Sequence, residues 1–283
     1  MTSKGIKEIK HESTTHLWEA LRPENYNSET IFRGQRDSRW RLVPSIYREP
    51  NSMLADQSSF FEWQTIKSFI NCCDKQGLSF YGDSPEFREK YLTELPQKYG
   101  DEWPYKELIN ILAVCQHHGI PTRLLDWTKR PYVAAYFAAS TALEYIYQQQ
   151  KENNDVNLDD KYISIWSLDL NYINLEKKIE IASVPGTVSP NLMAQSGLLM
   201  FMKEKIEMGK PFPNEPLDTK ILTEDCEITK HLISIRKILE ILELCEKYNI
   251  NTSTMFPGYD GAAKYVTQQF MEDKVRLLFE SNP

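Results

Sequence analysis

The sequence predicts an α+β fold, in which helices pack on a small mixed β-sheet. Three observations lead to this prediction. Several long segments repeat apolar residues with the period of a helix, and a few short segments are typical of strands. The two kinds of segment do not alternate regularly along the chain, as they would in a doubly wound parallel sheet.

Size and composition limit the class of protein. The chain has 283 residues, of which 41% are hydrophobic and 12% aromatic, so it can form one or two buried cores. Its net charge of −7 argues against a general nucleic-acid coat protein, which needs a basic field, although a local basic site stays compatible. No apolar run approaches the ~18–20 residues that span a bilayer, and the first residues lack the apolar core of a secretory signal. The five cysteines include no CxxC pair, so we expect free thiols in a reducing cytoplasm. Because there is no long apolar run, we also expect no membrane partner.

Four segments have the period of an amphipathic helix: Ser58–Cys73, Glu102–His118, Thr128 to about Tyr147, and His231–Lys247. In the first, Ser59 and Glu62 have the spacing of a capping box, in which each side chain satisfies an amide of the first turn. Gly119 and Pro121 end the second helix.

The third helix follows Thr128, which is a good N-cap residue, and its first turn tolerates Pro131. One face of this helix has mostly small side chains, which let a neighbouring element approach closely. These residues are Ala134, Phe137, Ala138 and Thr141.

Shorter segments predict the strands and loops. Strands are expected at Glu29–Arg33, Tyr162–Leu170 and Gly197–Met202, and exposed loops at Gln148–Lys161 and Gly209–Leu222. Turn residues at Pro185-Gly186 precede the last strand, and Asp260-Gly261 precedes a terminal helix.

The first candidate site lies at the end of the first predicted strand. Arg33 stands there beside Gly34, whose missing side chain allows a turn or a close approach to a ligand. Such an arginine can fork onto a phosphate or a carboxylate. A solvated arginine face, with Trp40 covering the core, is the alternative, because Arg36, Arg39, Arg41 and Arg48 follow closely.

The second candidate site lies at the joint between two predicted helices. Arg123 and Asp126 are three residues apart and could pair, and with Thr122 they collect polar groups at one point. The alternative is that Asp126 only fixes the joint. His117 and His118 point about 100° apart on a helix, so both cannot bind one ion, and we expect no metal site. One of the two histidines lines the joint as a hydrogen-bonding group.

The third candidate is Gln195, which precedes the Gly197–Met202 strand. It could place its amide over a ligand, or it could hydrogen-bond a loop. The chain has no GxSxG, P-loop or GxGxxG motif that would assign a reaction by itself.

Taken together, these motifs resemble the FRG-domain family of bacterial and phage proteins. The resemblance rests on Phe32-Arg33-Gly34, on QHHGIPTRLLDWT at Gln116–Thr128, and on PYVAAYFA at Pro131–Ala138. It continues in NLMAQSGLLMF at Asn191–Phe201 and in the FPxxDG pattern that begins at Phe256. The resemblance implies one FRG-type domain over 1–283, with an N-terminal extension at 1–28 and a mainly helical part at 205–283.

A more distant similarity, to ADP-ribosyltransferases, implies a function. In that superfamily a strand ends in Arg-Gly or His-Gly, as at Arg33-Gly34, and a second element resembles Thr122–Thr128 with the helix that follows. A third strand carries a Glu, and Gly197 of Gln195-Ser196-Gly197 stands at the corresponding place.

The similarity implies an ADP-ribosyltransferase-like fold that uses NAD as its substrate, for ADP-ribosyl transfer or for NAD hydrolysis. Its catalytic residues would be Arg33, Asp126 and Gln195, and its NAD-binding residues would be Arg33, Gly34, His118, Thr122 and Arg123. The acceptor would be a protein or a nucleic acid, and the protein could be a toxin or a phage-defence effector. The alternative is a non-enzymatic FRG module that binds an anion, a nucleotide or a partner. We expect Arg33, Arg123 and Gln195 to meet in one cleft, with Phe32-Arg33-Gly34 beside the Gly197–Met202 strand.

Overall fold

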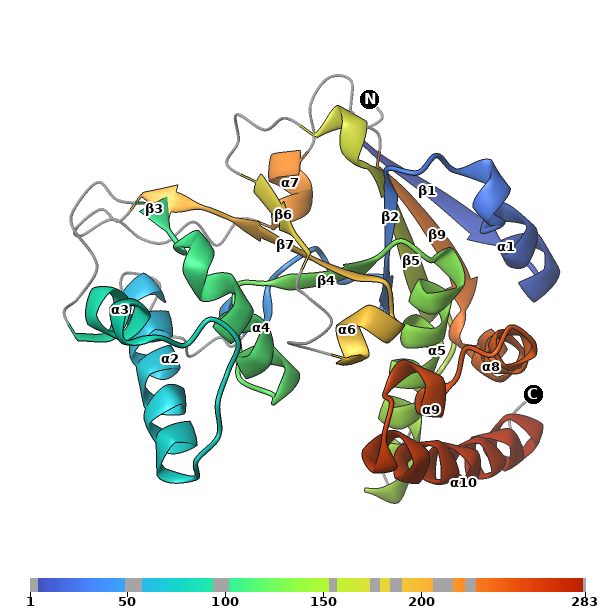
Figure 1. The fold of residues 1–283 in the computed structure, drawn as a ribbon. Coiled ribbons are helices and arrows are strands. Elements are labelled where there is room, and N and C mark those ends of the chain that lie inside the picture. The colour runs from blue at the N-terminus through green and yellow to red at the C-terminus, as the bar shows by residue number, and fades with distance from the viewer. Residues whose placement is uncertain are drawn as a thin grey trace.

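A computed structural model describes the chain at 5–48, 58–93, 102–152, 157–173, 179–183, 190–205, 216–221 and 228–281. Within these ranges the fold is a mixed seven-stranded sheet with helices packed against it (Figure 1). The predicted turn at Pro185-Gly186 lies outside the described residues, as does Cys226. The mixed α and β content agrees with the prediction, but the sheet is larger than expected.

The sheet has the strand order β1-β9-β5-β2-β4-β7-β6. β1 runs parallel to β9, and every other neighbouring pair is antiparallel. Its strands are β1 (Ile6–His11), β2 (Thr30–Gln35), β4 (Leu125–Thr128), β5 (Tyr162–Asp169), β6 (Ile179–Ala182), β7 (Gly197–Met202) and β9 (Ile228–Ser234). A separate ribbon pairs β3 (Glu102–Trp103) with β8 (Glu204–Lys205).

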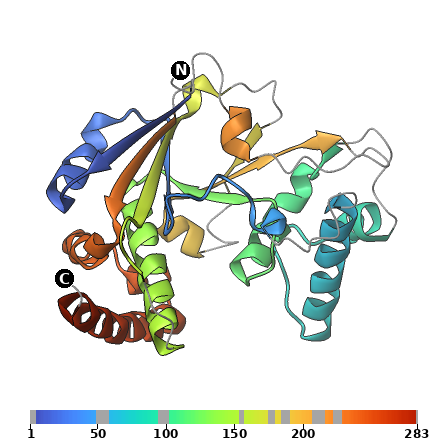
Figure 2. The ribbon, with the colours of Figure 1, turned by 180° about the vertical axis from the view of Figure 1, so that it is seen from behind.

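The helices gather in two groups, seen from the two sides in Figures 1 and 2. Near the N-terminal strand and the C-terminus lie α1 (Thr14–Ala20), α5 (Pro131–Lys151), α8 (Ile238–Lys247), α9 (Thr252–Met255) and α10 (Tyr259–Ser281). The other group contains α2 (Ser58–Lys75), α3 (Pro85–Arg88) and α4 (Ile109–His117). The short helices α6 (Pro190–Ala194) and α7 (Leu217–Ile221) flank β7 and β6.

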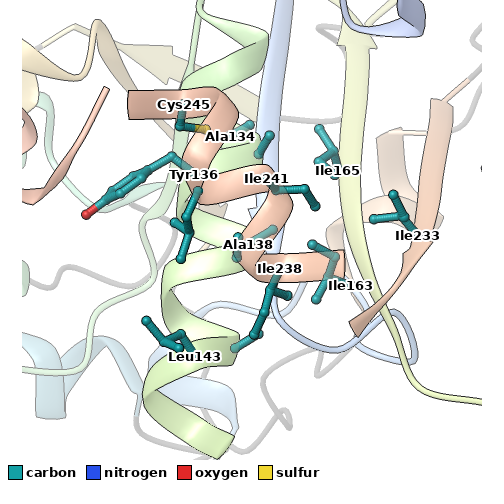
Figure 3. Packing of buried hydrophobic residues seen from close by; sticks show 14 of the residues in the cluster. Ala134, Tyr136, Ala138, Leu143, Ile163, Ile165, Ile233, Ile238, Ile241 and Cys245 are labelled. Carbon is teal, nitrogen blue, oxygen red and sulfur yellow. The ribbon is translucent and has the colours of Figure 1, made fainter. Parts of the chain in front are cut away.

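The largest core lies between α5, α8 and the strands β5 and β9 (Figure 3). Ile163 and Ile165 of β5 are fully buried there, and so is Ile241 of α8. Burying each such side chain contributes roughly 1.5–3 kcal/mol to stability. As the small-residue face predicted, α5 approaches β2 very closely, because a Cβ added to Gly34 would lie 1.9 Å from the carbonyl oxygen of Ala134.

A second core joins α2 and α4 to β7. Trp63, Ile66 and Ile70 are buried on one face of α2, and they pack with buried residues of α4 such as Leu112. The capping box predicted at Ser59 is wrong, because the carboxylate of Glu62 is buried here and accepts hydrogen bonds from other segments.

A third core covers the remaining face of the sheet. Leu125 and Trp127 alternate with the polar residues of β4 and pack there with Trp166 of β5 and Met200 of β7. Leu217 of α7 closes this core, so the loop predicted at Gly209–Leu222 contains a short helix within its described residues.

Two predicted helices begin later than expected. Residues His231–Ser234 belong to β9, because a strand there can pair with both β1 and β5 and bury β-branched side chains on both faces. The apolar spacing that predicted a helix is satisfied only from Ile238 onward. Similarly, Glu102 and Trp103 form β3, and the helix begins at Ile109.

Other sequence-based boundaries agree more closely. The strands at β5 and β7 match their predicted ranges within a residue, and α5 extends to Lys151, four residues into the predicted loop. Residues 1–28 include β1, and residues 205–283 include β9, so both segments contribute strands to the sheet. The four described cysteines are free thiols. Within the described ranges, no helix combines the length and apolarity that crossing a membrane requires.

Candidate functional site

A cleft of about 310 Å³ opens where the two helical groups meet over the sheet. Its floor lies between β2 and β4, which share a single register pair, Phe32 with Thr128. Helices α4 and α5 form its walls, and α6 and the segment after α9 close it. The polar residues that line it are Arg33, Gln116, His117, Asp126, Thr128, Thr141, Asn191 and Gln195.

Arg33 extends from β2 towards β4 at the floor of the cleft. Its Nη1 donates a hydrogen bond to the backbone oxygen of Asp126 at 2.5 Å. Its Nε is buried and has no hydrogen-bond partner among the described residues. The pKa of Arg33 is lowered to about 10, mainly because burial removes solvent; Asp126 opposes this decrease and Arg48 adds to it. The guanidinium remains a cation near neutral pH, held in surroundings that favour an added anion.

Asp126 lies beside Arg33 with its side chain accessible from the cleft. Surrounding protein atoms nevertheless displace enough bulk water to raise its pKa, against the opposing effects of Arg33 and Gln116. Gln116 Nε2 donates to Asp126 Oδ1 at 2.6 Å. No other described side chain donates to this carboxyl group, which therefore keeps hydrogen-bonding capacity for a ligand.

The Gln116 amide is oriented by a residue outside the cleft. Thr122 is fully buried, and its hydroxyl donates to Gln116 Oε1. Ser45 in turn fixes Thr122, because Ser45 Oγ accepts from the Thr122 backbone nitrogen at 3.0 Å. Thr122, predicted as a ligand-binding residue, does not line the cleft; its hydroxyl instead positions Gln116. Sequence reasoning missed Gln116 itself, although it is the first residue of the QHHGIPTRLLDWT motif.

Gln195 lines the cleft, as predicted, but its amide is already engaged. Its Nε2 donates to the backbone oxygen of Met255 at 3.0 Å, and its backbone oxygen accepts from Thr128 Oγ1 at 2.6 Å. Both contacts join β4 and α9 to the segment before β7. This arrangement agrees with the alternative in which Gln195 hydrogen-bonds a loop. Thr128 also accepts from the backbone nitrogen of Arg130, which is the N-cap residue of α5 in place of the predicted Thr128.

Of the two adjacent histidines, His117 rather than His118 lies in the cleft. Asn191 Nδ2 lies 3.1 Å from His117 Nε2. Burial lowers the pKa of His117, and nearby His118 and Lys264 lower it further. His118 is exposed and stacks on Phe69 of α2. The predicted NAD-binding role of His118 therefore has no support in its position, and the sequence signal, a helical histidine pair, could not distinguish the two.

Arg123 does not reach the cleft, contrary to the predicted convergence with Arg33 and Gln195. Its side chain is 2% exposed and forms a 2.5 Å ion pair with Glu62, whose side chain is 1% exposed. The expected pair between Arg123 and Asp126 is therefore wrong. Gly34 does line the cleft, but its close contact with α5 already explains why this position lacks a side chain.

The motif Phe32-Arg33-Gly34 was expected beside Gly197–Met202. Instead, β4 lies between β2 and β7, and Asp126 pairs in register with Leu199 of β7. This insertion is what brings Asp126 next to Arg33.

Further arginines make the surroundings of Asp126 positive. Arg48 is close enough to Asp126 and Arg36 for their charges to affect its pKa, which burial lowers. The guanidinium of Arg36 lies 4.8 Å from the ring centre of Trp40 and 4.9 Å from that of Tyr145. Trp40 is 38% exposed, so the core position considered for it is wrong. A cleft with one partly satisfied carboxyl group and Arg33 in its lining, with Arg48 close by, can bind an anionic ligand and stabilise one developing positive charge. In the described ranges, no cluster of three or more histidine, cysteine, aspartate or glutamate side chains is arranged to hold a metal.

Comparison with known proteins gives one match. A family model described as FRG domain matches residues 28–145, which include β2, the Gln116–Thr128 motif and most of α5. No curated protein and no solved structure matches the chain. The segment that carries Arg33, Gln116 and Asp126 is therefore supported as part of the FRG-domain family.

Proposed function

We propose that the cleft binds NAD and that the protein is an ADP-ribosyltransferase-like enzyme, acting by ADP-ribosyl transfer or by NAD hydrolysis. The observation that carries this proposal is the meeting of Arg33 and Asp126 in one partly desolvated cleft. They come from β2 and β4, far apart in sequence, and both were expected at an NAD site from the resemblance. An ADP-ribosyltransferase-like fold and a bacterial or phage origin form part of the same proposal.

Arg33 would bind the diphosphate of NAD through its free Nε and its remaining donors. A planar guanidinium can make two parallel contacts with phosphate oxygens, and such charge-assisted bonds are stronger than neutral ones. Arg48 and Arg36 extend the positive field beyond Arg33.

Asp126 would face the ribose carbon from which nicotinamide leaves. The bond between that carbon and the nicotinamide nitrogen breaks, and its electron pair neutralises the pyridinium ring. The carboxylate stabilises the cationic ribose, and water or an acceptor nucleophile then bonds to the same carbon and gives up its proton to solvent. Gln116, held by Thr122, would keep the carboxylate oriented.

Asp126 takes this role because glycine stands at the expected glutamate position, where Leu192 lies close. A Cβ added to Gly197 would lie 2.6 Å from Leu192 Cδ2 and 3.1 Å from the Leu192 backbone oxygen. Among the residues that line the cleft, Asp126 is the carboxylate available. The resemblance further suggests a toxin or phage-defence effector in the cytoplasm, with a protein or nucleic-acid acceptor.

The direct test is release of nicotinamide from NAD by the purified protein, with and without a cell lysate. We expect turnover by the wild-type protein and a loss of at least about 100-fold in Asp126→Asn, which keeps the shape but removes the charge. Arg33→Lys should weaken NAD binding by roughly 10- to 150-fold, because an ammonium cannot reproduce the two-point contact. Melting temperatures near that of the wild type are required of both variants.

The second candidate function is a non-enzymatic module that binds an anion or nucleotide in the same cleft. The hydrogen bond from Gln195 Nε2 to Met255 favours it, because it ties one donor of a group expected to act on NAD to the protein backbone. Binding of NAD or ADP-ribose without nicotinamide release, and sensitive to Arg33→Lys, would establish this alternative. Unchanged affinity in Arg33→Lys for every anion tested would reject both functions for this cleft.

A further inference from the structure

A second and larger cavity, of about 590 Å³, lies on the other side of the junction between β4 and α5. Three cationic side chains line it: Arg22 follows α1, and Lys129 and Arg130 lie between β4 and α5. The chain has a net charge of −7, yet ion pairs with carboxylates do not account for these three cations. Among the described residues, neither Lys129 nor Arg130 forms an ion pair, and Arg22 has only a 3.9 Å contact with Glu19.

The same cavity has an aromatic wall. Tyr132 stacks on Trp18 with ring centres 4.1 Å apart and planes within 1° of parallel. Tyr248 leans on this stack, with its ring centre 5.0 Å from that of Tyr132. Tyr132 is buried, but Tyr248 is 53% exposed, so one aromatic ring is accessible in the cavity beside the three cations.

One carboxylate, that of Glu24, shares the cavity. Glu24 and Arg22 lie near enough to Tyr132 for their charges to act on the pKa of its hydroxyl, which burial raises. The cavity thus combines cations for phosphate, an accessible aromatic ring, and one acceptor suited to hydroxyl or amino groups. Proteins that bind nucleotides and single strands use this combination, with phosphates on the cations and bases stacked on aromatic rings.

We infer that this cavity is a second binding site, for a nucleotide unit, with its phosphates on Arg22 and Lys129 and its base against Tyr248. Free nucleotides and the nucleotides of a single strand share this chemistry. The site is distinct from the Arg33 cleft and does not depend on the function proposed there. Its volume lies within the range of small-molecule sites, roughly 300–1,000 Å³.

The test measures binding by calorimetry in an Arg33→Lys background, in which nucleotide binding in the cleft is weakened. The probes are ADP, adenosine, pyrophosphate and an oligodeoxyadenylate. We expect ADP to bind, and Arg22→Gln combined with Lys129→Gln to weaken it by at least about tenfold. The matched control, Lys151→Gln with Lys274→Gln, removes the same charge from exposed positions outside the cavity and should leave affinity unchanged.

Substitutions of Tyr248 test the base contact. Tyr248→Phe keeps the ring and should keep the affinity for ADP, whereas Tyr248→Leu should weaken it roughly 5- to 150-fold. A melting temperature for each variant, near that of the background protein, shows that the fold is intact. If the Tyr248→Leu variant binds ADP with full affinity, the proposed base contact is wrong. The same conclusion follows if pyrophosphate binds as tightly as ADP.

The oligodeoxyadenylate identifies the source of the nucleotide. Tighter binding than ADP, with affinity that falls more steeply as salt rises, indicates a single strand, because each further phosphate contact adds about −0.7 to the salt slope. Equal or weaker binding indicates a free nucleotide. Loss of affinity in the control pair equal to that in the Arg22 and Lys129 pair overturns the site itself. Nicotinamide release plays no part in these measurements, so failure of the two proposals is distinguishable.

Discussion

At the scale of single residues, the position of Gly34 is set by packing. A Cβ there would meet the backbone of α5 at two points, 1.9 Å from Ala134 O and 2.7 Å from Ala138 N. Backbone atoms cannot turn aside as a side chain can, so β2 or α5 must move. The triplet Phe32-Arg33-Gly34 therefore combines a charged residue for the cleft with a residue that allows the closest strand–helix contact.

We predict that Gly34→Ala destabilises the protein by about 1–3 kcal/mol or more through overpacking. Gly77→Ala is the matched control, because its Cβ meets nothing within 4 Å although its φ is +68°. That variant should lose only about 1 kcal/mol, from backbone strain. Urea denaturation of both proteins measures the difference, and equal losses would show that the close contact with α5 is not what excludes a side chain.

The buried pair between Glu62 and Arg123 is the second residue-scale feature. Arg123 Nε and its backbone nitrogen both donate to this carboxylate, and so does Trp103 Nε1. Sequence spacing pointed to Asp126 as the partner of Arg123, because a partner 61 positions away cannot be found without the fold. The role of Arg123 is thus to join α2 to the segment before β4.

We predict that Glu62→Gln destabilises the protein by about 3–5 kcal/mol, because it leaves the buried guanidinium without its counter-charge. Asp74→Asn offers a control, since it weakens the pair of Asp74 with Arg88, whose side chains are 40% and 36% exposed. Such accessible pairs contribute at most about 1 kcal/mol. Thermal and urea unfolding compare the two, and a small effect in Glu62→Gln would contradict the buried pair.

At the scale of elements, β9 is a segment where the helical spacing of apolar residues predicted the wrong secondary structure. Its residues continue the apolar spacing of α8, yet β9 pairs along its length with β1 and β5. Pairing on two sides depends on partner residues 60 or more positions earlier in the chain, which the local sequence pattern does not record. By contrast, β5, β7 and α5 were predictable, because strand residues or helical period there agree with the tertiary environment.

A histidine on β9 makes the strand pH-sensitive. His231 is buried, with Nδ1 2.9 Å from His11 Nε2 of β1 and Nε2 3.2 Å from the hydroxyl of Tyr26. Burial, together with the charges of His11 and Lys7, lowers the pKa of His231 to about 4. The unfolded chain then binds more protons between the two pKa values, so this stability is present above pH 6.5 and is lost as pH falls towards 4.

We predict that acidification from pH 7 to pH 4 removes roughly 3 kcal/mol of stability through His231. His231→Gln should flatten this part of the profile relative to the wild type, because glutamine does not titrate. The measurement is urea unfolding at several pH values. Parallel profiles for the two proteins would contradict the assignment to His231.

At the scale of the whole molecule, the segment matched by the family model and the folding unit differ in extent. The matched residues 28–145 contain β2 and β4, but β2 pairs over its length with β5, and β4 pairs with β7. The main core also includes Leu17 before that segment and Val275 far beyond it. The candidate site was predictable in part, at Arg33, Asp126 and Gln195, because these residues lie in motifs. His117 and Gln116 needed the orientation of α4.

We predict that a fragment of residues 28–145 alone does not fold, because it lacks both outer neighbours of its strands. Circular dichroism and amide proton dispersion should report an unfolded chain, whereas the full chain should be folded under the same conditions. A cooperative melting transition in the fragment would contradict the dependence of β2 on β5.

The single register pair between β2 and β4 has a mechanical consequence. Each strand pairs along its outer side, β2 with β5 and β4 with β7, but β2 and β4 share one register pair, Phe32 with Thr128, and the hydrogen bond from Arg33 to the backbone of Asp126. The sheet thus consists of two well-paired halves, β1-β9-β5-β2 and β4-β7-β6, with little pairing between them. Arg33 and Asp126 belong to different halves. A ligand that contacts both residues would link the two halves more tightly. We therefore expect ligand binding to slow deuterium uptake by the backbone amides of 32–35 and 125–128.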